Sequence, residues 1–481
     1  MPNATQLTPG EAVARRTIAA YTLTPEQLRK SEALHRIGLE LSLASTLLDF
    51  AVLAALIAAR FVPRLQGLMQ RLPERICPQS AKNGQIGGPS AKKRWVQAVI
   101  TVPALLLVLS IFQLPLRIYG HRIALAYGLS VQDWGGWLID RAKSELLVLF
   151  FATLVLWGLY ALIRRSPRRW WLYAWLCAVP IMAGMVFISP VLIDPLFNRF
   201  EPLADTNPEL ASQLRNLASS AGLEIPPSRI YLMHASEKVT TYNAYVTGFG
   251  ATKRIVVWDT TARDLTMPQT LFVFAHEMGH YQLHHIYLGL AFAALLTLAG
   301  LWFVSRLAPA VLRRLALSWA AGRWRTGSSG ARSWGVRWHP SKPTAGSLGT
   351  PRWHPSKPTA GSLETTHIPA LGDWSSLPLL LLLAGLLSFL GEPLANAFSR
   401  WEEHQADLYA VTITRPVFFR AGQDPAQIAA QSFQVLGEKS YSYPKPSPLL
   451  VFWSYSHPPI AQRIRFVLGG PARASHWPLP R

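Results

Sequence analysis

The sequence predicts a mainly α-helical protein that crosses a membrane several times and carries a small domain containing a β-sheet. Half of its 481 residues are hydrophobic and only 15% are charged, whereas a typical soluble protein has about 25% charged residues. Six segments are apolar over roughly the 20 residues that a helix needs to cross a bilayer. Composition and segment length therefore both favour a multi-spanning membrane protein.

The predicted spans lie near 37–60, 96–118, 144–163, 170–192, 285–306 and 377–398. The first contains Glu40 and Asp49, and the last contains Glu392 and Asn396, all of which are unfavourable against lipid. These residues predict either a polar chamber between the helices or buried hydrogen-bonded pairs, and both interpretations stay open.

The soluble stretch 194–284 separates the fourth and fifth spans. Asn207 and Pro208 begin a predicted helix that ends at Gly222 and has leucines on one face. Three short strands are predicted next, at 229–233, 244–247 and 254–258. An edge strand of such a sheet could hold an extended peptide by main-chain pairing, or it could be only scaffold.

The clearest chemical signal is HEMGH at residues 276–280. Thr266 and Gln269 have the spacing of a capping box, with Pro268 in the first turn, so the motif falls on a helix. On a helix, His276 and His280 project from one face and can bind one Zn²⁺. Glu277 can then take a proton from a water molecule that attacks a carbonyl. The sequence thus predicts a metallohydrolase site.

A third ligand is expected beyond the last span, in SRWEEHQAD at 399–407. An antiparallel pair of spans separates this segment from HEMGH, so both lie at the same membrane face. On position alone, the third ligand could be any of Glu402, Glu403, His404 and Asp407, although we favour Glu403.

Residues 309–375 differ from the rest of the chain. RWHPSKPTAGSL occurs twice, at 337–348 and 352–363, among many glycine, serine, proline and arginine residues. The repeat has no apolar periodicity, which predicts a disordered insertion, and the repeated His339 and His354 are not expected to bind metal.

The chain therefore divides into four predicted regions. They are an N-terminal membrane region with four spans at 1–193, a catalytic domain at 194–284, two spans flanking the insertion at 285–398, and a C-terminal catalytic region at 399–481.

Charge and cysteine usage exclude other classes. The net charge of +21 comes from basic residues in short loops beside apolar runs, which disfavours nucleic-acid binding. Cys77 and Cys177 are the only cysteines, so a disulfide framework and a cysteine metal cluster are both excluded. The N-terminus lacks the early apolar core of a secretory signal peptide.

Five motifs in order, PLFNRFEPL, NAYVTGFGATKRIVVWDT, HEMGH, SRWEEHQAD and SHPPIAQR, resemble those of the type 1 CAAX prenyl endopeptidases. The resemblance covers nearly the whole chain except the repeat insertion. It implies an integral-membrane zinc metalloprotease with one Zn²⁺ per chain and a cytoplasmic catalytic face. The positive-inside rule instead places the basic loop at Arg164 and Arg165, opposite the catalytic face, in the cytoplasm; we follow the resemblance.

The resemblance also implies roles for individual residues. Glu403 becomes the third zinc ligand, and Asp407 supports a ligand from behind. Asn243, His457 and Arg463 are implied to hold the substrate backbone or the developing oxyanion. Eukaryotic members have seven spans around a large chamber, whereas six are predicted here, and the insertion is foreign to the family.

The predicted function is hydrolysis of peptide bonds in peptide or protein substrates, possibly lipidated, delivered from the membrane lipid. One alternative is a broad quality-control membrane protease. Another is a catalytically silent scaffold or transporter with a structural zinc, but Glu277 argues against it because a structural site needs no base.

Overall fold

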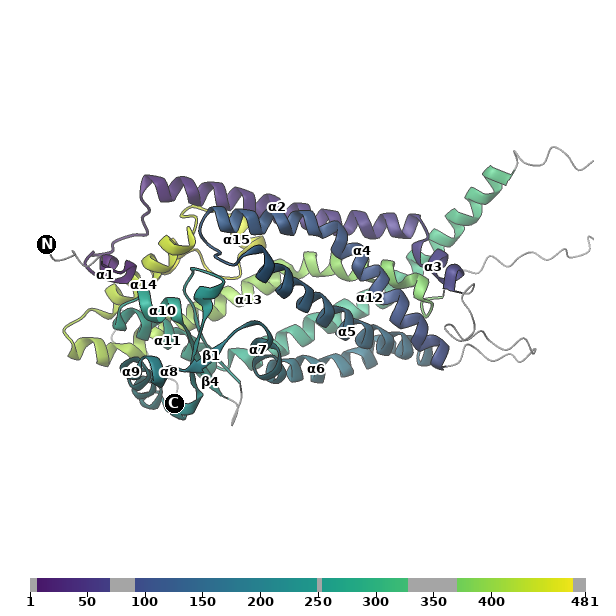
Figure 1. Cartoon of the computed structure of the whole chain (residues 1–481). Coiled ribbons are helices and arrows are strands. Elements are labelled where there is room, and N and C mark those ends of the chain that lie inside the picture. Colours follow the sequence, from purple (N-terminus) through teal and green to yellow (C-terminus); the bar gives the residue numbers. More distant parts are fainter. Residues whose placement is uncertain (1–6, 70–90, 249–252, 328–369, 470–481) are drawn as a thin grey trace, which may run out of the picture.

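The computed structural model describes residues 7–69, 91–248, 253–327 and 370–469. Within these ranges, six helices are long and apolar enough to cross a membrane, as predicted. They run side by side along most of the molecule, and a domain of shorter elements sits at one end (Figure 1). The six are α2 (Pro25–Ala58), α4 (Ala91–Ala126), α5 (Trp134–Arg165), α6 (Trp170–Ile188), α12 (His285–Gly327) and α13 (Leu377–Arg420).

These helices extend beyond the spans that hydropathy alone predicted. Helix α2 begins at Pro25 rather than near residue 37, and α13 continues to Arg420 rather than ending near residue 398. A capping box at Thr24 begins α2, because the Thr24 hydroxyl accepts a hydrogen bond from the backbone of Gln27 and the Gln27 side chain accepts one from the backbone of Thr24. The added turns are polar, so a hydropathy criterion does not detect them.

The polar residues in the spans support both interpretations that the sequence left open. Asp49 and Glu392 line a cavity of about 1120 Å³ between the helices. Asp49 also accepts a hydrogen bond of 2.7 Å from Gln113. Asn396 is buried and donates a hydrogen bond to the backbone carbonyl of Trp453. Glu40 is exposed on the surface of α2.

Residues 309–327, which were predicted to belong to a disordered insertion, are helical. Helix α12 continues through Pro309 to Gly327, and Ala308 and Leu312 are buried along it. The predicted start at residue 309 was wrong because the helix of the fifth span continues past Pro309. Both copies of the repeat lie outside the described residues.

A four-stranded sheet lies in the domain at the end of the bundle, with strand order β1-β2-β4-β3. Strand β2 pairs in parallel with β4, whereas β1 and β3 are antiparallel edge strands. The three predicted strands are confirmed, and β1 is additional. The strands are β1 (Phe200–Pro202), β2 (Ile230–Met233), β3 (Ala244–Thr247) and β4 (Arg254–Trp258).

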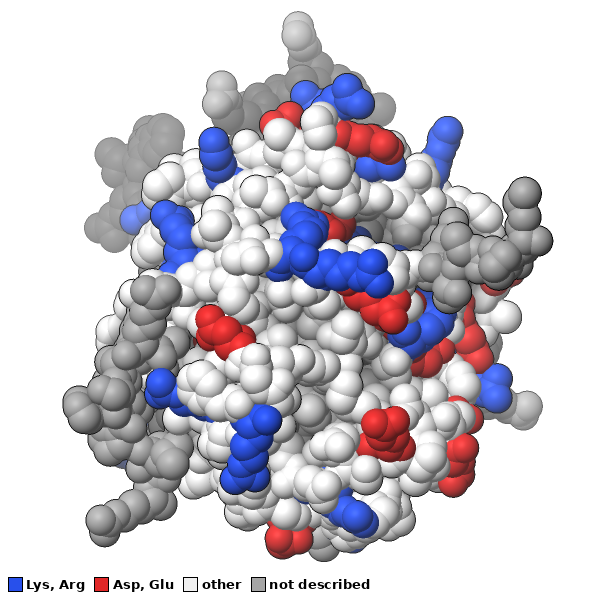
Figure 2. Space-filling view, turned by 90° about the vertical axis from the view of Figure 1, so that its left-hand side faces the viewer, with Lys and Arg blue, Asp and Glu red and all other residues white. Residues whose placement is uncertain are grey.

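Helices cover this sheet and enclose the largest hydrophobic core. Helix α9 is capped by Asn207 and buries Leu210, Leu214 and Leu217, as predicted. The end face of the domain carries charged residues of both signs on a mostly uncharged surface (Figure 2). Besides α9 (Pro208–Ser220), the shorter helices are α1 (Pro9–Ala14), α3 (Phe61–Met69), α7 (Asp194–Phe197), α8 (Leu203–Thr206), α10 (Asp259–Asp264), α11 (Met267–Gln282), α14 (Pro425–Ser440), α15 (Pro448–Ser454) and α16 (Ile460–Gly469).

The N-terminal segment, residues 9–22, is bound along α14. The side-chain amide of Gln427 both accepts from the backbone N–H and donates to the carbonyl of Ile18. Gln434 holds the backbone of Thr22 in the same two-point manner. The two glutamine side chains thus make the hydrogen bonds that a neighbouring strand would make. The backbone N–H and C=O groups of Ile18 and Thr22 therefore have partners although this segment is not part of a sheet.

Candidate active site

Helix α11 carries the HEMGH motif into the core of the domain. The predicted capping box at Thr266 and Gln269 is present, and the apolar residues from Leu271 to Ala275 are buried. The Nε2 atoms of His276 and His280 face each other at 3.2 Å. A helical spacing of four residues therefore places two potential ligand atoms together, as the motif predicts.

Helix α13 crosses α11 at Gly279. A Cβ atom added there would lie 3.0 Å from the Cα atom of Ala406, so glycine permits this close approach of the two helices. The approach brings Glu403 to the histidines, with its carboxylate oxygens 3.4 Å from Nε2 of His276 and of His280. One ligand atom from each of these three residues lies within 4.8 Å of the other two.

The chemistry of these donors fits a zinc ion. Two imidazole nitrogens and one carboxylate match a catalytic zinc site that keeps a position open for water or substrate. The Oε2 atom of Glu403 is buried and lies 3.4 Å from Nε2 of His276 and 3.3 Å from Nη1 of Arg463, both longer than an ordinary charge-assisted hydrogen bond. A buried carboxylate that faces two imidazoles and is held only at these distances fits a site that a cation completes.

The other three candidates for the third ligand, which are also on α13, make different contacts. His404 faces the ring of Phe466, at 5.0 Å between centroids. Glu402 is half-buried, next to Gly289 of α12. Asp407 is completely buried one turn beyond Glu403, and its Oδ1 atom lies 2.9 Å from Nδ1 of His276.

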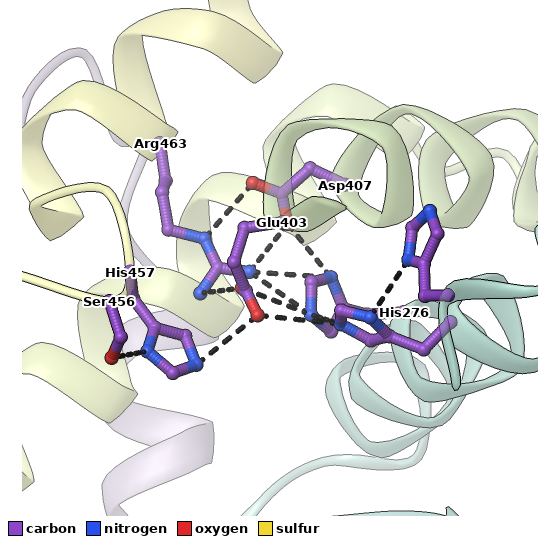
Figure 3. A network of polar contacts seen from close by, with 8 residues as sticks. His276, Glu403, Asp407, Ser456, His457 and Arg463 are labelled. Atoms are coloured by element: carbon purple, nitrogen blue, oxygen red, sulfur yellow. Dashed lines mark hydrogen bonds and ion pairs between the residues drawn. The ribbon is translucent and has the colours of Figure 1, made fainter. Parts of the chain in front are cut away.

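Arg463 connects α16 to this cluster. It is buried and donates two hydrogen bonds to Asp407, and its Nη1 atom lies 3.3 Å from Glu403 (Figure 3). Burial alone would lower the pKa of Arg463, but the charge of Asp407 and hydrogen bonds to it outweigh this effect and raise it. The guanidinium therefore stays charged beside the carboxylates.

His276 is held from behind by this ion pair. Burial would lower its pKa, but hydrogen bonds to Asp407 and Glu403 raise the pKa to about 9. Glu277, next to it in sequence, is half-buried. Burial raises the pKa of Glu277, which makes its carboxylate a better proton acceptor.

The other two residues implied by the resemblance are His457 and Asn243, and of these two only His457 contacts the cluster within the part of the chain that the structure describes. His457 is 62% exposed, and its Nε2 atom lies 3.2 Å from Oε1 of Glu403. Figure 3 shows it facing Glu403 beside Ser456, whose hydroxyl lies 2.9 Å from Nδ1 of His457. Asn243 is exposed at the start of β3, and its side chain accepts a hydrogen bond from the backbone of Ala244.

His285 is a residue at the site for which the sequence raised no expectation. Its Nδ1 atom lies 3.0 Å from Nδ1 of His280. The signal was present as the pair His284 and His285 after HEMGH. Which of the two histidines contacts His280 depends on the path of the backbone after α11, which the sequence does not give.

A membrane helix bundle that carries HExxH beside a buried glutamate defines an integral-membrane metalloendopeptidase. Residues 204–469 match peptidase family M48, and residues 14–199 match the CAAX prenyl protease N-terminal region with five membrane helices. The described residues of the latter range hold four candidate spans. The chain belongs to peptidase family M48 and, within it, to the type 1 CAAX prenyl protease family, which supports a metalloendopeptidase over a silent scaffold.

Individual relatives agree with this assignment. An uncharacterized metalloprotease of Bacillus subtilis is 35% identical over 390 residues, covering 79% of this chain and 78% of the relative. A CAAX prenyl protease 1 homolog of Arabidopsis thaliana is 26% identical over 364 residues, covering 75% and 70%. The crystal structure of Ste24p from S. mikatae superimposes with a TM-score of 0.64 at 21% identity, covering 96% and 93%, and shows the same fold.

Proposed function

We propose that this protein is a zinc endopeptidase that cleaves lipid-bearing peptides, such as CAAX-terminated chains, at the membrane surface. The observation that carries the proposal is the convergence of His276, His280 and Glu403 where α11 meets α13, a helix that also lines the cavity within the bundle. The names of the eukaryotic relatives as CAAX prenyl proteases support the substrate class.

The residues divide the chemistry among them. His276, His280 and Glu403 would hold the zinc ion, which when bound would polarise the scissile carbonyl and acidify water. Glu277 takes the proton of the attacking water and passes it to the leaving amine. Asp407, itself held by Arg463, orients His276 through Nδ1.

Three further groups are proposed to hold the substrate backbone or to favour the developing oxyanion. His457 reaches the edge of the cluster from the exposed side, and Arg463 adds a positive charge beside Glu403 that favours a developing oxyanion. Strand β3 is an edge strand packed near α11. An extended peptide that paired with β3 would pass Asn243 on its way to the zinc ligands.

The proposal is tested by comparing one CAAX peptide with and without its prenyl group. Purified protein in detergent is expected to cleave the prenylated form faster, and Glu277→Gln protein is expected to cleave neither. Equal cleavage of both forms together with cleavage of unrelated unfolded chains would favour the broad quality-control protease.

We also propose that the catalytic face lies in the cytoplasm, as the resemblance implies. The opposite end carries Arg164 and Arg165 at the end of α5, and the positive-inside rule assigns the reverse orientation. A single cysteine placed at exposed Ser456 in a cysteine-free variant distinguishes the two. Labelling by an impermeant maleimide only after the cells are opened supports the cytoplasmic face, and labelling of intact cells contradicts it.

A further inference from the structure

His285 is the first residue of α12 and contacts the candidate metal ligand His280 from behind. Its side chain is buried, with the residue 4% exposed. The two Nδ1 atoms are 3.0 Å apart, and the ring centroids are 5.0 Å apart at an interplanar angle of 72°. This distance is that of a hydrogen bond between ring nitrogens.

The contact depends on a break between α11 and α12. On one continuous helix, residues five apart point about 140° away from each other, so His285 could not face His280. Helix α11 instead ends at Gln282, and His284 adopts a left-handed conformation with φ 62°. That conformation is unfavourable for a residue with a side chain, and it redirects the chain so that His285 returns to the site.

The proposed zinc site fixes the position of the proton on His280. Nε2 of His280 faces Nε2 of His276 and the carboxylate of Glu403, so it is the nitrogen whose lone pair would bind the zinc ion. In a neutral imidazole the proton would then be on Nδ1. His280 would donate this hydrogen bond, and Nδ1 of His285 would accept it.

The two candidate histidine ligands are thus supported by different groups. Asp407 carries a negative charge behind His276, whereas a neutral imidazole lies behind His280. A group that accepts a hydrogen bond from the outer nitrogen of a ligating histidine holds the tautomer and the ring orientation that binding needs.

We infer that His285 is a positioning residue for zinc binding, acting through His280. The inference rests on the proposed zinc site. It assigns His285 no contact with the substrate and no share in proton transfer.

His284 provides a matched control in the neighbouring position. It is exposed, and its ring lies 5.8 Å from that of Tyr287, away from His280. Asparagine tolerates the left-handed conformation better than most residues, so His284→Asn should preserve the turn. Comparing variants of His285 with His284→Asn distinguishes loss of the contact with His280 from the general effect of losing a histidine near the site.

The experiment measures zinc affinity by competition with a chromophoric chelator, using full-length protein in detergent. All variants carry Glu277→Gln, so that the measurement does not depend on catalysis. His285→Phe removes the acceptor and is expected to weaken zinc binding 10- to 100-fold. His285→Gln keeps an acceptor oxygen and is expected to restore most of the affinity, and His284→Asn should stay within about twofold of the parent.

A second readout separates positioning from packing. The melting temperature of each variant is measured with and without zinc, and His285→Leu replaces His285→Phe if the latter does not elute as a single peak. A positioning residue reduces the rise that zinc causes and leaves the metal-free melting temperature nearly unchanged. A packing residue lowers the metal-free value and leaves the rise intact, which contradicts the inference.

Two further outcomes are distinguishable. Parental zinc affinity in His285→Phe, or equal weakening in His284→Asn, overturns the role of His285 while the zinc site stands. If His276→Ala also binds zinc like the parent protein, the ligand set itself is wrong and the proposed function fails with it.

Discussion

Arg463 and Asp407 form a buried two-point ion pair directly behind His276. Nε of Arg463 lies 3.0 Å from Oδ2 of Asp407, and Nη2 lies 2.5 Å from Oδ1. Arg463 is 8% exposed and Asp407 is fully buried. Neither charge has access to bulk water, so each depends on the other for compensation.

Removing Arg463 should therefore destabilise the fold as well as the site. We expect Arg463→Ala to lose about 3–5 kcal/mol of stability, because it leaves the Asp407 carboxylate buried without its partner. Thermal unfolding in detergent measures the change. Arg465→Ala is the control, since Arg465 is exposed two residues further along α16. Equal melting temperatures for the two variants would show that the ion pair does not contribute to the stability of the fold.

Glu277→Gln should retain zinc and lose peptide cleavage. Glutamine preserves the shape of the side chain but cannot accept the proton of the attacking water. Elemental analysis measures the metal, and a quenched fluorescent peptide measures turnover. His276→Ala should lose both properties, and chelation of the wild-type protein should abolish turnover until zinc is added back. Turnover at the wild-type rate in Glu277→Gln would falsify the assignment of the base.

Adding a lipid chain to a peptide should lower its KM in liposomes much more than it changes kcat. His280 contacts His285, the residue at which the fifth candidate span begins, so we expect the site to lie close to the membrane boundary. A lipid chain gains about 0.8 kcal/mol per buried CH₂ by partitioning there. Steady-state kinetics on lipidated and bare versions of one peptide test this. Equal KM values in the same liposomes contradict delivery from the membrane surface.

Deleting Gly335 to Glu364, which removes both repeats, should leave activity intact. These residues lie outside the described part of the chain, and a segment without a core tolerates removal when its ends can be joined. The matched control is Trp374→Ala, in the segment that the structure describes next along the chain. Trp374 is buried and stacks on Tyr160 at 4.2 Å, so its removal should cost about 3–5 kcal/mol. Loss of zinc from the deletion variant would instead make the insertion structural.

Gly437→Ala should loosen the N-terminal segment from α14. A Cβ atom at Gly437 would lie 2.6 Å from the ring of Tyr21, whose hydroxyl donates to the carbonyl of Ser442. We expect a loss of about 1–3 kcal/mol from overpacking, seen as a lower melting temperature and faster proteolysis near residues 9–22. Gly158→Ala is the control, because no atom lies within 4 Å of its added Cβ. Unchanged proteolysis in Gly437→Ala means that Tyr21 simply moves aside.

Much of the architecture was predictable because its signals are local. The number of spans, the helix after Asn207, the three predicted strands and the capped helix of HEMGH each follow from neighbouring residues. Hydropathy over about 20 residues, capping boxes and alternating side chains arise from interactions between residues close in sequence. Here the tertiary structure did not override them. Polar helix ends and the short strand β1 lack such signals and were missed.

The surroundings of the metal ligands needed the tertiary structure. Glu402, Glu403, His404 and Asp407 share one helix, and only the rotation of α13 about its axis decides which of them reaches the Nε2 atoms of His276 and His280. That rotation is set by packing, at the point where Gly279 lets α11 approach Ala406. For the same reason, the sequence does not distinguish His284 from His285. The left-handed conformation of His284 buries His285 against His280. Contacts between distant segments depend on the whole fold, which no local pattern encodes.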